Sequence, residues 1–220
     1  MLLPLRDENP TRRFPVVTVL FIATNIVVFF TQVLSPQGLE MSILRMGAIP
    51  YEITHFTSIP QIPRIPPFLT LLTSMFLHAG MFHLLGNMLY LWIFGNNVED
   101  FLGPAKFILF YILSGLGAAF THIAFNPNSQ VPMVGASGAI AGVLGGYFLL
   151  YPRARVDTLV FLFFFIRVVP VPAAFVLGFW FLGQFLNIGL GGGVAWFAHI
   201  GGFLAGAVLI KAFAPGRNRR

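Results

Sequence analysis

Long apolar runs constrain this chain more than any other feature of its sequence. Runs of close to twenty residues recur along it, and each is long enough to cross about 30 Å of hydrocarbon as a helix. Of the 220 residues, 57% are hydrophobic and only 9% are charged, whereas roughly a quarter of the residues of an average soluble domain are charged. The core of a water-soluble domain could not bury so many hydrophobic residues. The sequence therefore predicts an integral membrane protein.

The runs predict an all-α, polytopic fold of six transmembrane helices in a single membrane domain over residues 1–220. The expected spans are 15–34, 82–101, 105–125, 133–150, 171–187 and 194–213. A short segment, 1–14, precedes the first span, and a basic tail, 214–220, follows the last. Because no small-residue cleavage site follows the first run, we expect it to be a retained helix and not a signal peptide. The apolar stretch 156–169 is interrupted by Asp157 and Arg167 and is too short to span.

The positive charges predict the orientation of these spans. With six spans and the N-terminus inside, only Arg45 and Arg64 of the 13 lysines and arginines lie outside, as the positive-inside rule requires. A seventh span at 156–169 would break this pattern, so we place that stretch on the inner surface. The net charge of +6 is then explained by basic residues at the ends of the spans, where they would meet anionic lipid headgroups. It does not indicate that the chain binds nucleic acid. We expect a bacterial cytoplasmic membrane with both termini in the cytoplasm.

Four polar side chains are predicted to meet at one depth of the membrane. The second, fourth and sixth spans all run from outside to inside, and their outer ends carry His83 and Asn87, then Ser137, then His199. Each lies within about 10 Å of its helix start, at a rise of 1.5 Å per residue. Asn87 shares a helical face with His83. Polar groups inside a span are costly and mark candidate functional sites. Each of these polar groups also has a structural alternative. The four could lie at one depth by chance near the interface, His83 and Asn87 could hydrogen-bond between helices, and Ser137 could be a small residue in a close helix contact.

These side chains suit nucleophilic chemistry. A serine hydroxyl needs an imidazole to take its proton, and the resulting oxyanion needs preorganised donors. Ser137 and His199 supply the first pair; His83, the Asn87 amide and the Ser137 N–H, at a helix start, supply the second. All seven acidic residues lie away from the outer halves of spans four and six, so we predict a dyad without a carboxylate.

Other intramembrane chemistries lack their residues here. The chain has no cysteine, which excludes thiolate catalysis and cysteine-bound zinc. A His-Glu-x-x-His motif and a pair of buried aspartates, which zinc and aspartyl proteases need, are also missing. We therefore expect neither a metal nor a cofactor.

The sequence resembles the rhomboid intramembrane serine proteases in three motifs taken together: Gly135-Ala136-Ser137-Gly138, His83-x-x-x-Asn87 and Ala198-His199-x-x-Gly202-x-x-x-Gly206. The resemblance implies an endopeptidase that cleaves transmembrane segments of other proteins in contact with membrane lipids. It implies Ser137 as nucleophile, His199 as general base, and His83, Asn87 and the Ser137 amide as the oxyanion site. His78 and Glu99 match positions in the family's second-helix region, where support roles are expected.

Two departures from the family pattern affect the expected site. No Trp-Arg pair occurs in the first outer loop between Ser35 and Pro67, and Ala141 replaces a tyrosine that in some members packs on the catalytic histidine. Support for the His199 ring must therefore come from elsewhere. A set of glycines is predicted to let spans four and six approach closely: Gly142, Gly145, Gly146, Gly202 and Gly206.

Several other residues have a structural interpretation beside a functional one. Glu99 is expected to neutralise an inner arginine or cap a backbone, and His78 either supports the site or faces the membrane interface. His55 and His122 are expected at the surface or interface. The tryptophans are expected as interfacial anchors or packing residues: Trp92, Trp180 and Trp196.

Two non-catalytic alternatives remain, a rhomboid-like protein that binds transmembrane helices and a small transporter. Retention of both Ser137 and His199 argues against the first, and the lack of paired repeats argues against the second. For the protease we expect small residues at the scissile position and a wet cavity at the outer mouth of the site. The sequence does not specify the natural substrate or the oligomeric state.

Overall fold

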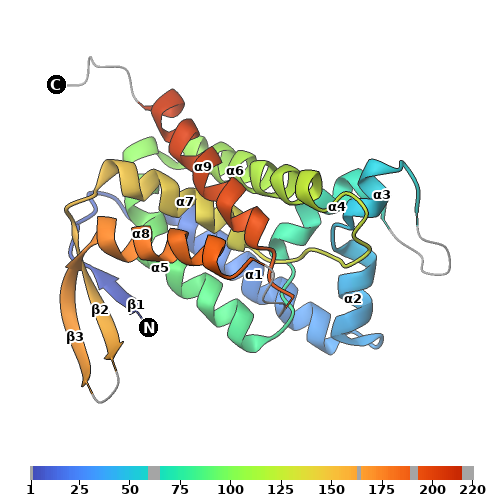
Figure 1. The fold of residues 1–220 in the computed structure, drawn as a ribbon, viewed down its shortest axis with the longest axis horizontal. Helices are drawn as coiled ribbons and strands as arrows, with labels where there is room; N and C mark the ends of the chain where they lie inside the picture. The colour runs from blue at the N-terminus through green and yellow to red at the C-terminus, as the bar shows by residue number, and fades with distance from the viewer. Residues whose placement is uncertain (1, 59–64, 163–164, 189–192, 215–220) are drawn as a thin grey trace.

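We describe the fold from a computed structural model of residues 2–58, 65–162, 165–188 and 193–214. In this part of the chain, six helices of 14 residues or more match the predicted spans to within a few residues, and they pack into one bundle (Figure 1). Their bounds are α1 Val16–Leu34, α5 Met81–Leu102, α6 Pro104–Phe125, α7 Ser137–Leu150, α8 Ala173–Leu186 and α9 Trp196–Phe213. Arg64 and the tail arginines Arg217, Arg219 and Arg220 lie outside the described residues.

The helices differ in whether they are long enough to span a membrane. Among the described residues, α1, α6 and α9 are long and apolar enough on their own. A fourth candidate is α5 together with the segment before it, which consists of α4 (Pro67–Thr73) and η1 (Ser74–Phe76). This segment and α5 meet at a bend of 78°. Helices α7 and α8 are apolar but have only 14 residues each. The short helices α2 (Gly38–Met46) and α3 (Pro50–Thr54) lie in the loop after α1.

Helix α7 lies at the centre of the bundle because its small residues permit close approach on several sides. Every residue from Gly138 to Tyr147 is buried. A Cβ atom added at Gly202 or Gly206 of α9 would lie 2.1 or 2.0 Å from a carbonyl oxygen of α7, and one at Gly145 would lie 2.0 Å from the Phe203 carbonyl oxygen. The predicted packing role of these glycines is therefore confirmed. Gly142 packs on Ser114 of α6, and Gly146 on Phe110.

A small antiparallel sheet departs from the predicted all-α fold. The described chain is mainly helical, but β1 (Leu2–Asp7), β2 (Arg155–Leu162) and β3 (Phe165–Pro172) pair in the order β1-β2-β3 at one end of the bundle (Figure 1). The stretch 156–169, expected only as a surface segment, forms most of β2 and β3. It is rich in β-branched residues, which favour strands. Its pairing with β1, about 150 residues away in the sequence, satisfies backbone groups that the hairpin alone would leave open.

The sheet is joined to α7 by a hydrogen bond between two side chains. The Tyr147 hydroxyl donates to Asp7 Oδ2 at 2.8 Å. Burial raises the pKa of the Asp7 carboxyl to about 6, although this hydrogen bond acts in the opposite direction. Beside Asp7 on β1, Arg6 Nε lies 3.9 Å from Asp157 Oδ2 of the neighbouring strand β2.

Glu99 of α5 caps the start of α1, which was one of its two predicted structural roles. The carboxylate is only 4% exposed. It accepts hydrogen bonds from the backbone N–H groups of Val17 and Thr18, at 2.9 and 2.8 Å, and from the Thr18 hydroxyl at 2.8 Å. Two N–H groups of the first turn of α1 are thereby satisfied, and the negative charge lies at the positive end of the helix.

Candidate active site

Ser137 and His199 meet where α7 and α9 begin. Ser137 is the first residue of α7, and His199 lies in the first turn of α9. His199 Nε2 lies 2.8 Å from Ser137 Oγ, within hydrogen-bonding distance. The close contact between the two helices, which the glycines permit, keeps both side chains at this distance. Ser137 and His199 are each partly buried.

His83 of α5 lies against the backbone just before Ser137. Gly135 has a φ of +126°, a conformation that favours glycine. A Cβ atom added there would lie 2.8 Å from both Cε1 and Nε2 of the His83 ring and 3.5 Å from Ser137 Oγ. The missing side chain of Gly135 therefore makes room for the imidazole beside the serine.

One hydrogen bond to the His83 ring indicates which ring nitrogen carries the proton. The backbone N–H of Ala79 donates to His83 Nδ1 at 3.4 Å. Since Nδ1 accepts, the proton of the neutral ring is on Nε2, the atom beside Gly135. His83 thus has an N–H donor directed to the region of Ser137.

All four predicted site residues line one cavity of about 820 Å³. Asn87, one turn after His83 on α5, is 8% exposed, and its Nδ2 has no hydrogen-bond partner among the described residues. A buried amide donor is costly to leave unpaired, so it is available for an acceptor that enters the cavity. The arrangement combines a hydroxyl, a base and two side-chain donors, which is the set that acyl transfer at a carbonyl group requires.

Gln184 of α8 is a site residue that the sequence reasoning missed. Its Oε1 lies 2.7 Å from His199 Nδ1. The rule that marks polar residues inside spans applies to it as well, since Gln184 lies near the outer end of the fifth predicted span, at the depth of the other four. Depth alone marks Gln184 as a candidate, but the rotation of α8 decides whether its side chain faces His199.

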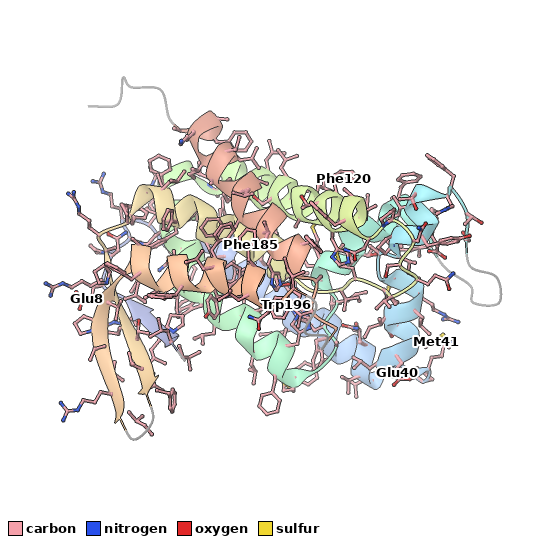
Figure 2. The ribbon with its side chains drawn as sticks, viewed as in Figure 1. Glu8, Glu40, Met41, Phe120, Phe185 and Trp196 are labelled. Carbon is pink, nitrogen blue, oxygen red and sulfur yellow. The ribbon has the colours of Figure 1, made fainter. Side chains whose placement is uncertain are left out.

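Aromatic rings support His199 where Ala141 cannot. The centroid of the Trp180 ring lies 5.7 Å from that of His199, and the Trp196 ring lies 6.1 Å away at 87°. Trp196 begins α9, toward the middle of the bundle (Figure 2). Trp180 and Trp196 are therefore packing residues of the site, whereas Trp92 is exposed.

The remaining histidines differ in their relation to the site. His78 is fully buried, its backbone is bonded to Gln32 of α1, and its ring packs on His83 with the centroids 5.1 Å apart. The alternative that His78 faces the membrane interface is therefore wrong. His122 is half-buried and lines the cavity, which corrects the expectation of a surface residue. His55 is exposed, as expected.

Comparisons with known proteins agree on one family. The Rhomboid domain model matches residues 67–215, which include all four predicted site residues and Gln184. The chain is 31% identical to "Rhomboid protein 1, mitochondrial" of Saccharomyces cerevisiae over 167 residues, which cover 69% of this chain and 45% of that protein.

A bacterial relative shows higher identity over a shorter segment. The "Rhomboid protease GluP" of Bacillus subtilis is 43% identical over 81 residues, 37% of this chain and 15% of that protein. The "RHOMBOID-like protein 12, mitochondrial" of Arabidopsis thaliana is 31% identical over 168 residues, 68% of this chain and 48% of that protein. The chain thus spans less than half the length of each of these three relatives. With a family model that covers more than half of its residues, this integral membrane protein belongs to the rhomboid family.

Proposed function

We propose that the protein is an intramembrane serine endopeptidase that cleaves transmembrane segments of other membrane proteins with a Ser137–His199 dyad. The observation that carries this proposal is the 2.8 Å separation of Ser137 Oγ and His199 Nε2 inside the cavity. Family membership supports the reaction class, since named proteases are among the relatives.

The positions of the atoms support the following proposed chemistry. His199 Nε2 takes the proton of Ser137 as Oγ attacks the scissile carbonyl, and the tetrahedral oxyanion accepts hydrogen bonds from His83 Nε2–H, Asn87 Nδ2–H and the Ser137 N–H. The imidazolium then gives its proton to the leaving amine as the C–N bond breaks. Water, activated by the same ring, hydrolyses the acyl-enzyme and restores Ser137.

We further propose that α1 and the five helices α5 to α9 all cross the membrane, with the basic side facing the cytoplasm of a bacterium. Helix α7 rises only about 21 Å over its 14 residues, less than the roughly 30 Å of hydrocarbon. Its N-terminal Ser137 would then lie below the outer surface, and the cavity would bring water to that depth. The eleven-to-two split of basic residues supports this orientation.

Substrate geometry limits what such a site can cleave. A carbonyl group inside a helix is hydrogen-bonded and crowded, so attack requires local unwinding, which glycine, proline or a frayed helix end makes easier. We expect transmembrane substrates with small residues at the scissile position.

The decisive test compares the wild type with Ser137→Ala in proteoliposomes that contain a model transmembrane substrate. We expect cleavage and covalent labelling by a fluorophosphonate probe with the wild type only, and no change on addition of strong chelators. Cleavage by purified Ser137→Ala at the wild-type rate would refute the mechanism. Substrate binding by the wild type without cleavage or labelling would instead favour a non-catalytic helix-binding protein.

A further inference from the structure

Gln184 connects the proposed general base to the backbone of α8. Its Oε1 lies 2.7 Å from His199 Nδ1, and its Nε2 donates to the Trp180 carbonyl oxygen at 2.6 Å. On the other side of the ring, His199 Nε2 lies 2.8 Å from Ser137 Oγ. One continuous series of hydrogen bonds therefore runs from the Trp180 carbonyl to the Ser137 hydroxyl.

The first member of this series determines the direction of every hydrogen bond in it. A backbone carbonyl only accepts, so the amide nitrogen of Gln184 faces Trp180 and the amide oxygen faces His199. An amide oxygen also only accepts, so Nδ1 of His199 carries the proton. The lone pair of the neutral ring is then on Nε2, where the Ser137 hydroxyl donates to it. This is the tautomer that a general base for Ser137 needs.

We infer that Gln184 is a positioning residue that selects this tautomer of His199 and fixes the ring in its plane. The inference rests on the proposed function for its catalytic consequence. Trp180 and Trp196 contact His199 as rings, so they limit its tilt. These ring contacts do not distinguish the two nitrogens of His199, whereas the hydrogen bond at Nδ1 does. Gln184 is 6% exposed, so water competes little for this bond.

The bond strengthens as the reaction proceeds. When His199 takes the Ser137 proton it becomes an imidazolium, and the Nδ1–H donor to Gln184 Oε1 becomes charged. An interaction that is stronger in the transition state than in the substrate complex raises kcat and leaves substrate binding unchanged. Gln184 contributes in this way without placing a buried negative charge beside the histidine.

Three variants separate this role from a purely structural one. Gln184→Met keeps the approximate length of the side chain and removes the acceptor. Gln184→Glu keeps an oxygen that faces His199 Nδ1, whether the new carboxyl group is protonated or ionised. Asn187→Leu is the matched control, because the Asn187 amide makes the same kind of backbone bond, to the Gly183 carbonyl at 2.6 Å.

Kinetics in proteoliposomes provides the first measurement. For Gln184→Met we expect kcat to fall roughly 3- to 10-fold, the range for loss of one hydrogen bond, with KM within about twofold of wild type. Gln184→Glu should recover at least half of the loss, and Asn187→Leu should match the wild type. The inference is overturned if Gln184→Met keeps full kcat, if Gln184→Glu is no better, or if the control falls equally.

The tautomer itself provides a second measurement that needs no turnover. In ¹⁵N-histidine-labelled protein in lipid, with the His199 signals identified by comparison with His199→Ala, we expect a proton on Nδ1 in the wild type and a mixture of tautomers in Gln184→Met. A wild-type ring with its proton on Nε2 overturns the inference even if the enzyme is active. Full cleavage by Ser137→Ala would instead refute the proposed function and leave the tautomer result standing.

Discussion

A methyl group added at Gly202 is expected to separate Ser137 from His199. Gly202 lies three residues after His199 on α9, and an added Cβ would lie 2.1 Å from the carbonyl oxygen of Gly138, the residue after Ser137. Ordinary contact begins near 3.4 Å, so the two helices must move apart by about 1.3 Å. A shift of that size along the hydrogen bond would stretch the 2.8 Å distance to about 4 Å, beyond hydrogen-bonding reach.

The size of the effect follows from this geometry. Misplacement of a reacting group by about 1 Å costs roughly 10²-fold in rate, and overpacking of a core costs about 1 to 3 kcal/mol of stability. We therefore expect Gly202→Ala to lose roughly 10²-fold in kcat and in fluorophosphonate labelling, while the protein stays folded with a lower Tm in the same detergent.

The matched control is Gly178→Ala on α8. A Cβ added at Gly178 meets no atom within 4 Å in the described structure, so this variant should keep the wild-type kcat and labelling rate. Wild-type labelling by Gly202→Ala would refute the argument that helix contact sets the Ser137–His199 distance. Equal loss in Gly178→Ala would show that the effect is not specific to the α7–α9 contact.

Three further predictions concern single side chains. Ser137→Ala and His199→Ala should each abolish cleavage, and the double variant should be little worse than either, because the pair acts as a unit; additive losses would contradict this. Asn87→Ala should lower kcat by roughly 10² to 10³ with little change in KM; normal kcat with a Tm loss would make Asn87 a packing residue. The folded pKa of Asp7, about 6, exceeds its usual 3.8, so the contribution of this group to stability is full below pH 4 and is lost as pH rises through 6. Asp7→Asn should therefore be about 1 kcal/mol more stable than wild type at pH 8, after discounting for partial exposure, and equal to it at pH 4; an equal or lower Tm at pH 8 would refute this.

The positions of the long helices and the grouping of the four predicted site residues in one cavity could be predicted because both depend on distance along the chain. An apolar run fixes where a helix can cross hydrocarbon, and the direction of each span fixes which end of it lies outside. The bounds of α5 and α9 accordingly agree with the prediction to within two residues. Depth along three helices then sufficed to group His83, Asn87, Ser137 and His199 into one cavity.

The sheet and the surroundings of His199 could not be predicted in this way because they depend on contacts between distant segments. Strand β1 pairs with β2 across about 150 residues, and apolar content alone does not distinguish a short strand from a short helix. Similarly, the rotation of α8 about its axis decides whether Gln184 faces His199 or lipid. Hydropathy gives no rotation for a helix that is apolar on all sides.

The proposed mechanism leaves the site uncharged before substrate is attacked, and this neutrality has a physical reason in a membrane. A carboxylate hydrogen-bonded to His199 would stabilise the imidazolium more strongly than an amide, but its desolvation in apolar surroundings would cost several kcal/mol. The uncharged resting state in which Gln184 bonds to a neutral His199 avoids that cost, and charge then develops only when a substrate carbonyl is attacked. The donors for this charge, on His83 and Asn87, are likewise neutral in that state. In the proposed mechanism, a dyad completed by an amide would therefore let serine chemistry operate at membrane depth with less buried charge than a dyad completed by a carboxylate.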